Sequence, residues 1–430
     1  MSPVSFAEAL RFWLKLGFIS FGGPAGQIAI MHQELVERRR WISEKRFLHA
    51  LNYCMVLPGP EATQLATYIG WMMHRTWGGI VAGGLFVLPS LFILIALSYV
   101  YMAYGSVPLV AGILYGIKPA VVAIVLAAAW RIGSRALRHG ALWAISVAAF
   151  AAIYAFNVPF PWIVITAALI GALGGRLAPA AFAVGGHGAS AKSYGAAILD
   201  DDTPVPEHAR FRPRRLLVML FLSLAIWGTA IGATYAWNAT LADMAGFFTK
   251  AALLTFGGAY AVLPYVYQAA VEHYHWLTGL QMIDGLALGE TTPGPLIMVV
   301  AFVGFVGAWV LQIFGAEHVF LAGAAGAAVA TFFTFLPSFV FIFLGGPLVE
   351  ATHGDLRFTA PLSGITAAVV GVVVSLAAFF AEHVFFARGI DWFSIALAAV
   401  ALVALTRYKA GLIPVIAAAG IAGMLWRFAT

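Results

Sequence analysis

Two Pro-Gly-Pro sequences, at 58–60 and 293–295, lie in apolar parts of the chain, and each has a glutamate beside it. Glu61 directly follows the first, and Glu290 stands three positions before the second. A break of this kind in an apolar helix leaves unpaired N–H groups and the positive end of the helix dipole at the start of the next half-helix, and both attract anions. A carboxyl in apolar surroundings can also carry a proton. The pattern therefore predicts anion binding at helix ends, with proton transfer at the two glutamates.

Three lysines in apolar surroundings could supply a formal countercharge for the anion. Lys15 and Lys250 each stand six residues before a Phe-Gly-Gly sequence, and Lys118 lies within an apolar segment as Gly-Ile-Lys-Pro. A charged residue inside a membrane segment is a candidate for function. Two simpler interpretations stay open, in which a lysine only extends its ammonium to the membrane interface and Glu61 only caps its helix.

The predicted substrate site combines the breaks with their polar neighbours and these lysines. Its residues are Gly22, Gly23, Pro24, Pro58, Gly59, Pro60, Gly257, Gly258, Pro293, Gly294, Pro295, Thr63, Gln64, Thr292, Lys15, Lys118 and Lys250. Thr67 and Thr291 are further neutral hydrogen-bonding side chains at the same depth. We predict no metal site and no cofactor, because the 11 histidines are scattered and Cys54 is the single cysteine.

The breaks recur in register, which indicates an internal repeat. Phe21, Trp41 and Pro58 correspond to residues 256, 276 and 293, and each pair is 235 positions apart. Further along, Leu-Pro-Ser at 88–90 corresponds to 336–338 with an offset of 248. Helix breakers repeated in two apolar halves are typical of secondary transporters with interrupted membrane helices. The alternative is that they only permit kinks or tight packing.

The composition defines the class of protein. Hydrophobic residues make up 62% of the 430 residues and charged residues 10%, against roughly 25% charged in an ordinary soluble domain. The mean hydropathy is +0.92. We therefore predict an all-α polytopic membrane protein. A membrane enzyme acting on lipid phosphates would need a clustered nucleophile or metal-ligand set, which this pattern lacks, so we predict that the chain is not an enzyme.

Charge asymmetry predicts the orientation. The stretch 37–46 holds five arginines and lysines, whereas its counterpart 272–281 holds none. By the positive-inside rule the first is cytoplasmic and the second faces outside, so the two halves are inverted. The predicted units are an N-terminal repeat at 1–175, a cytoplasmic linker with a connecting transmembrane helix at 176–239, and an inverted C-terminal repeat at 240–430. We expect the polar linker at 176–215 to be partly disordered.

The segments around the first Pro-Gly-Pro sequence are too short to cross the membrane separately. Residues 44–57 and 60–75 would each span roughly 21 to 24 Å as helix, against a hydrocarbon core of roughly 30 Å. A re-entrant hairpin turning at 58–60 fits better, and a second turning at 22–24 would keep the arginine-rich loops on one side. The prediction is about nine full crossings, or about thirteen hydrophobic segments if every broken element is counted as a span.

These motifs resemble a known family. The sequences FGGPA at 21–25 and LPGPEATQLATYIGW at 57–71 look like the N-terminal signature of the chromate transporter family, and TFGGAY at 255–260 with ETTPGP at 290–295 is similar to its C-terminal signature. The match covers both halves, as in the long, fused form of the family. The resemblance implies a transporter of the bacterial inner membrane that exports chromate, coupled to the proton motive force, and so gives chromate resistance.

Several alternatives remain at this point. Sulfate or a related oxyanion could be the substrate, and a passive anion channel would also use helix ends. The expected partners are chromate or a similar oxyanion, protons and membrane lipid, with no nucleic acid. A homodimer is left open.

Overall fold

The computed structural model describes residues 4–21, 23–182, 194–200, 203–256, 258–352, 359–387 and 389–429. In these residues the regular secondary structure is helical, apart from two isolated β-bridges. An apolar chain in lipid must hydrogen-bond its own backbone, and a helix does so within one segment. The predicted all-α class of membrane protein is confirmed.

The first half begins with two short helices and a re-entrant pair, followed by longer helices. Its elements are α1 Phe6–Ile19, α2 Gly23–His32, a π-helix Gln33–Arg38, α3 Glu44–Val56, α4 Glu61–Tyr104, α5 Pro108–Ala136, α6 Gly140–Tyr154, α7 Phe160–Leu177 and α8 Pro179–Phe182.

The connecting helix and the second half follow. They comprise a short 3₁₀ helix Glu207–Ala209, α9 Pro213–Trp237, α10 Ala239–Leu253, α11 Ala259–Tyr267, a π-helix Gln268–His273, α12 Gly279–Thr291, a 3₁₀ turn η4 Leu296–Met298, α13 Val299–Val310, a 3₁₀ turn Ala316–His318, α14 Val319–Thr352, α15 Thr359–Phe385, α16 Trp392–Thr406 and α17 Leu412–Ala429.

The internal repeat extends to irregular features of the backbone. The π-helix that continues α2 begins at Gln33, and the one that continues α11 begins at Gln268, 235 positions later. After each π-helix comes a non-glycine residue with positive φ, Arg40 at 55° and His275 at 53°. Such conformations are uncommon for non-glycine residues. Their recurrence at the same offset shows that both halves are built to one plan, with α9 as the unpaired helix between them.

The first Pro-Gly-Pro sequence forms a turn between two short helical segments, as the sequence predicts, and its re-entrant placement in the membrane stays a prediction. Helix α3 ends at Val56 and α4 starts at Glu61, and α4 itself is interrupted at His74 and Arg75, where φ and ψ are not helical. The chain then turns back on itself, because a Cβ on Gly70 would lie 2.4 Å from the carbonyl oxygen of Gly78. In the second half α13 and α14 repeat this contact at Gly304 and Gly326. The chain therefore makes two turns, at 58–60 and at 74–75, before the longer part of α4 begins.

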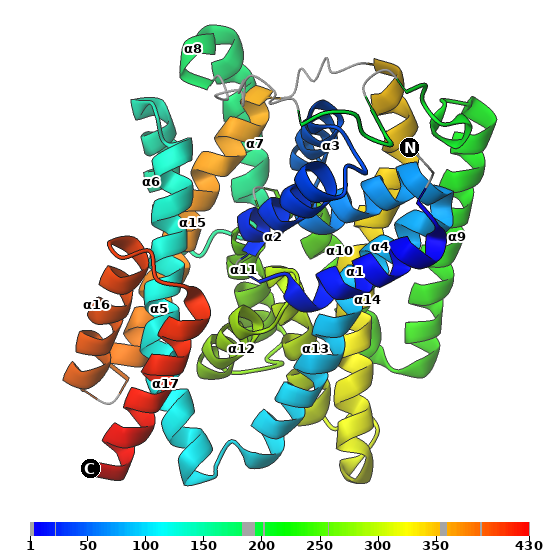
Figure 1. The fold of residues 1–430 in the computed structure, drawn as a ribbon. Coiled ribbons are helices and arrows are strands. Elements are labelled where there is room, and N and C mark those ends of the chain that lie inside the picture. The colour runs from blue at the N-terminus through cyan, green and yellow to red at the C-terminus, as the bar shows by residue number, and fades with distance from the viewer. Residues whose placement is uncertain are drawn as a thin grey trace.

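The described residues contain seven helices of membrane-spanning length, and the number of about nine full crossings stays a prediction. Seven helices, α4, α5, α7, α9, α14, α15 and α17, are long and apolar enough to cross a membrane. Three shorter apolar helical stretches lie at Gly140–Tyr154, Leu296–Val310 and Trp392–Thr406. Two of them, the 15-residue helices α6 and α16, pack against the long helices α15 and α5. In Figure 1 α6, α16 and α17 lie at one edge of the molecule and α9 at the other, with the short helices α2 and α10–α13 between them.

The halves exchange their outer helices. Helix α5 packs against α16 and α17 of the second half, and α15 packs against α6 and α7 of the first. Corresponding glycines make the close contacts: a Cβ on Gly116 would lie 2.0 Å from the carbonyl oxygen of Ala419, and one on Gly364 would lie 2.3 Å from that of Ala167. Small residues let membrane helices approach closely, because lipid gives no hydrophobic force between them. The halves are therefore one intertwined unit.

The end of the linker packs against the first half, and the expectation of partial disorder in the rest of the linker stays a prediction. Its residues 194–200 and 203–212 are described, whereas 183–193 and 201–202 lie outside the described residues. The N–H groups of Ile198 and Leu199 donate to the carbonyls of Arg40 and Trp41, each at 3.0 Å. The linker thus docks on the arginine-rich loop of the first half, a long-range pairing that its polar composition did not reveal.

We expect the loop at Arg38–Arg40 to face the cytoplasm and the loop at Glu272–His275 to face outside. Glu37 and His273 are both exposed, and Cys54 is buried. In a Cys54→Ala background, a membrane-impermeant thiol reagent should label His273→Cys in intact cells and Glu37→Cys only after permeabilisation. Labelling of both cysteines from the same side would contradict the inverted arrangement.

Candidate functional site

The first Pro-Gly-Pro turn is held by the second half of the chain. Gly59, with φ of 121°, donates its N–H to the carbonyl of Thr255 at 2.7 Å. Within the turn, the Gln64 amide donates to the carbonyl of Pro58 at 2.7 Å, and a Cβ on Gly59 would lie 2.6 Å from the Ser338 Oγ of α14. Only glycine accommodates this φ and this close approach without strain.

The second turn mirrors the first. Gly294, with φ of 107°, donates its N–H to the carbonyl of Ser20 at 2.7 Å. The Gln27 amide of α2 donates to the Gly294 carbonyl, and Ser90 of α4 donates to the Pro293 carbonyl. Ser90 and Ser338 are repeat counterparts. The helix break and the serine of each half therefore contact the turn of the opposite half. We use the name crossing for the two turns together with Ser20 and Thr255.

Free helix ends gather at the crossing. Helix α4, the η4 turn and α11 begin after Pro60, Pro295 and Gly258, and none of these three residues supplies a side-chain cap. The first N–H groups of a helix have no partner within it. The Thr63 hydroxyl of α4 is buried and has no hydrogen-bond partner among the described residues. The crossing thus presents donors of the kind that bind an anion at a helix start.

The other residues of the predicted breaks lie at a helix start or beside the turn glycines, apart from two that lie outside the described residues. Gly23 and Pro24 form the start of α2, and the buried residues Pro60, Pro293 and Pro295 flank the turn glycines. Gly22 and Gly257 were predicted to belong to the site, but they lie outside the described residues. The Thr292 hydroxyl donates to the carbonyl of Leu288 at 2.6 Å, so its proton is already used within α12.

The two glutamates flank the crossing in different settings. Glu290 is 7% exposed near the end of α12, and its carboxylate accepts a hydrogen bond from the Tyr260 hydroxyl of α11. Glu61 is half-buried as the first residue of α4. The repeat counterpart of Tyr260 is Ala25, so only the second half builds this contact. Each carboxyl stands beside one turn, and their predicted role in proton transfer stays a prediction.

The three lysines lie apart from one another. Lys15 on α1 and Lys250 on α10 are exposed, whereas the turn glycines are buried. Lys118 on α5 is half-buried, and its ammonium lies 2.9 Å from the Asp284 carboxylate of α12. A countercharge role for any of them stays a prediction, and Lys118 would have to exchange its present partner to fulfil it.

Sequence reasoning missed four residues. Gln27 and Tyr260 contact Gly294 and Glu290 at the crossing, and Tyr101 and Asp284 lie at the Lys118 ion pair. Asp284 carried a usable signal, because it is a charged residue within an apolar segment, the criterion that selected Lys118. Gln27 carried none, since its partner Gly294 is 267 positions away. Such a contact exists only once the two halves have folded together.

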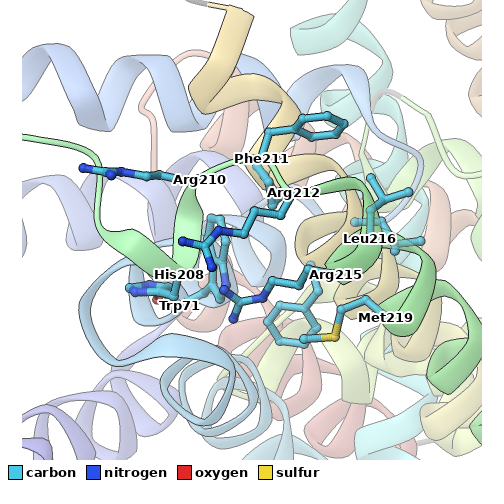
Figure 2. Close-up of a pocket in the computed structure, with 11 residues that line it drawn as sticks. Trp71, His208, Arg210, Phe211, Arg212, Arg215, Leu216 and Met219 are labelled. Atoms are coloured by element: carbon cyan, nitrogen blue, oxygen red, sulfur yellow. Dashed lines mark hydrogen bonds between the residues drawn. The ribbon is translucent and has the colours of Figure 1, made fainter.

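A cluster of cations lies where the linker meets α4, α9 and α14 (Figure 2). His208 hydrogen-bonds the carbonyl of Trp71 at 2.7 Å, and its burial lowers the pKa of the imidazole. Figure 2 shows Arg212 and Arg215 turned toward this pair and Arg210 turned away. The cavity between them is about 10 Å³, room for about one water. The cluster anchors the linker and has no space for an oxyanion.

Comparison with known proteins identifies transporters as relatives of this chain. The family model described as "Chromate transporter" matches residues 7–172 and 242–424. A chromate transport protein of Pseudomonas aeruginosa is 34% identical over 98% of this chain and 93% of its own length. A chromate transport protein of Cupriavidus metallidurans is 28% identical over 85% of this chain and 80% of its own. An uncharacterized transporter of Bacillus subtilis is 29% identical over 28% of this chain. No solved structure matches significantly.

We expect Gly59→Val and Gly294→Val each to abolish anion flux in membrane vesicles while the protein remains in the membrane. Valine is strained at positive φ, and its Cβ would lie 2.6 Å from Ser338 Oγ or 1.8 Å from Ser90 Oγ. The matched control is Gly84→Val on α4, where a Cβ meets open space. Normal flux in either turn variant would show that the crossing is not needed.

Proposed function

The chain belongs to the chromate transporter family, and we propose that it exports chromate from the cytoplasm across the bacterial inner membrane. The observation that supports this most directly is the crossing, where uncapped helix starts and the buried Thr63 hydroxyl converge at the re-entrant turns. A tetrahedral oxyanion needs several donors around it and some positive charge. Helix starts supply both without a formal cation.

The direction follows from the charge of the substrate. Moving one elementary charge across the membrane is worth about 2.3 kcal/mol per 100 mV, so a dianion leaving a cell that is negative inside gains about 4.6 kcal/mol. That corresponds to a concentration ratio on the order of a thousandfold. The membrane potential therefore favours export, and proton entry at Glu61 and Glu290 would add the pH gradient to it.

A carrier fits the crossing better than a passive channel. The turn glycines and Pro60 are buried, and hydrogen bonds join each turn to the opposite half. An anion can pass only if these contacts part on one side at a time, as in a transporter with alternating access. A channel would also give no role to the two glutamates. We therefore propose a transporter, not an enzyme or an open pore.

Sulfate is the second candidate substrate. It has the same tetrahedral shape and can carry the same charge as chromate, and backbone N–H groups at helix starts recognise these shared properties. The family match favours chromate, whereas the donors at the crossing are compatible with both.

We expect inside-out vesicles containing the protein to accumulate labelled chromate when their interior is made positive and acidic, and excess sulfate to compete only partly. Vesicles with Gly59→Val provide the control for leak. Equal uptake with and without the gradients would contradict an energised exporter. If an equal concentration of sulfate abolished the uptake of labelled chromate, sulfate would be the better assignment for the substrate.

We expect Glu290→Gln, and separately Glu61→Gln, to remove the dependence of chromate uptake on the pH gradient while oxyanion binding is kept. Glutamine preserves size and hydrogen bonding but cannot take up a proton. The control is Glu317→Gln, an exposed glutamate in the turn before α14. A glutamine variant that retains the normal pH dependence would exclude that glutamate from proton coupling.

A further inference from the structure

A cavity of about 1080 Å³ lies away from the crossing, between α5, α12, α17 and the loop that joins α15 to α16. Leu280 and Gln281, at the start of α12, line it. They adjoin the loop 272–278, which the charge rule assigns to the outside. No residue of either turn lines this cavity. It is therefore a vestibule on the predicted outer side, separate from the site described above.

The ion pair Lys118–Asp284 lies in the wall of this vestibule. The ammonium is 2.9 Å from Asp284 Oδ1, and the Tyr101 hydroxyl donates to Asp284 Oδ2 at 2.9 Å. The side chain of Asp284 is 3% exposed and that of Lys118 19%. A buried carboxylate needs such partners, because leaving either charge alone in an apolar region is costly.

The repeat does not require these charges. The counterpart of Lys118 is Thr366, whose hydroxyl donates to the carbonyl of Leu362 within its own helix. The counterpart of Asp284 is His49. The symmetry of the repeat therefore does not demand an ion pair at this position, because the counterpart residues Thr366 and His49 cannot form a lysine–aspartate pair. An ionisable pair inside a membrane segment points to a path for ions or protons.

The position of Asp284 on α12 connects the vestibule with the crossing. Asp284 and Glu290 are six residues apart on this helix, which corresponds to about 9 Å along its axis. Glu290 is at the crossing end and Asp284 at the vestibule end. An anion that moves from the crossing to the vestibule therefore passes the Lys118 ammonium. In this structure that ammonium is paired with the Asp284 carboxylate.

The other ionisable groups around Asp284 have partners of their own or lie at the surface. Asp391, in the loop before α16, accepts from the Tyr115 hydroxyl at 2.7 Å and caps α16. His383 of α15 has its Nδ1 3.0 Å from the Phe379 carbonyl. The groups contributed by the elements packed on α12 are Tyr101 from α4, Tyr115 and Lys118 from α5, Glu382 and His383 from α15, and Arg427 from α17, while α13 and η4 contribute none.

We propose that Lys118 is a second oxyanion site at the outer vestibule, and that Asp284 controls it by competing with the anion for the ammonium. This inference rests on the proposed function. When a proton from the vestibule water binds the Asp284 carboxylate, the neutral acid releases Lys118, and the oxyanion arriving from the crossing pairs with it. When that proton passes inward toward Glu290, the restored carboxylate reclaims Lys118 and expels the anion outward. Proton entry and anion exit are then linked at one ion pair.

The test measures occupancy of this vestibule directly. Ala111→Cys in a Cys54→Ala background places a thiol on the cavity wall, and a cationic, membrane-impermeant reagent labels it from outside in right-side-out vesicles. Sulfate, whose charge is constant near neutral pH, is the probe. We expect sulfate to slow the labelling, with half-protection at a lower concentration at mildly acidic than at mildly alkaline pH.

Two variants should move this half-protection concentration in opposite directions. Asp284→Asn should lower it about ten- to a hundredfold at alkaline pH and abolish its pH dependence, since a charge-assisted contact is worth roughly that factor. Lys118→Met should remove protection. Asp391→Asn, which alters another vestibule carboxylate, should leave the pH dependence in place. If the ion pair only holds α5 against α12, Asp284→Asn and Lys118→Met should lose sulfate protection to the same extent. That result would overturn the proposal.

Chromate uptake by the same Ala111→Cys protein in inside-out vesicles separates the two proposals. If the protein takes up chromate but sulfate does not protect the thiol at position 111, or the reagent does not label that thiol from outside, only the vestibule site is overturned. Absence of uptake would overturn the proposed function as well.

Discussion

Two backbone hydrogen bonds, from Gly59 to Thr255 and from Gly294 to Ser20, are the contacts on which the centre of this protein depends. A helix broken inside a membrane exposes N–H and C=O groups that lipid cannot satisfy, and each unsatisfied group is costly. Here each turn uses the carbonyl beside the break of the opposite half. Each turn therefore depends on the other half for a partner of its glycine N–H, which couples the two interrupted helices to one another.

The proposed function relies on departures from this symmetry. The two halves share the turns, the π-helices, the serines on the long helices and the lysines at 15 and 250, but four other ionisable groups do not repeat. Glu61 corresponds to Leu296 and Glu290 to Met55, and the charged pair Lys118 and Asp284 corresponds to uncharged Thr366 and to His49. A symmetric frame can bind an anion at its midplane equally from both sides. Directional coupling needs groups that one side has and the other lacks.

Much of the fold could be predicted because its signals are local. The breaks at 58–60 and 293–295, the constant offset of 235 and the arginine asymmetry all follow from residue types and spacing. The end of the first re-entrant helix near Arg75 was also predictable, since a segment of that length is too short to span. The docking of residues 198 and 199 on the loop at 40–41 was not, because a backbone pairing between distant segments leaves no mark in polar composition.

The sequence by itself determined the membrane class, the internal repeat and the positions of the breaks, because helix period, apolar length and helix-breaking residues act within single segments. Only the tertiary structure decided which side chains meet. It joined Gln27 to Gly294, Tyr260 to Glu290 and Lys118 to Asp284, and it left Lys15 and Lys250 exposed. These pairings depend on how separate helices turn and pack in three dimensions, and a list of candidate charges contains no such information.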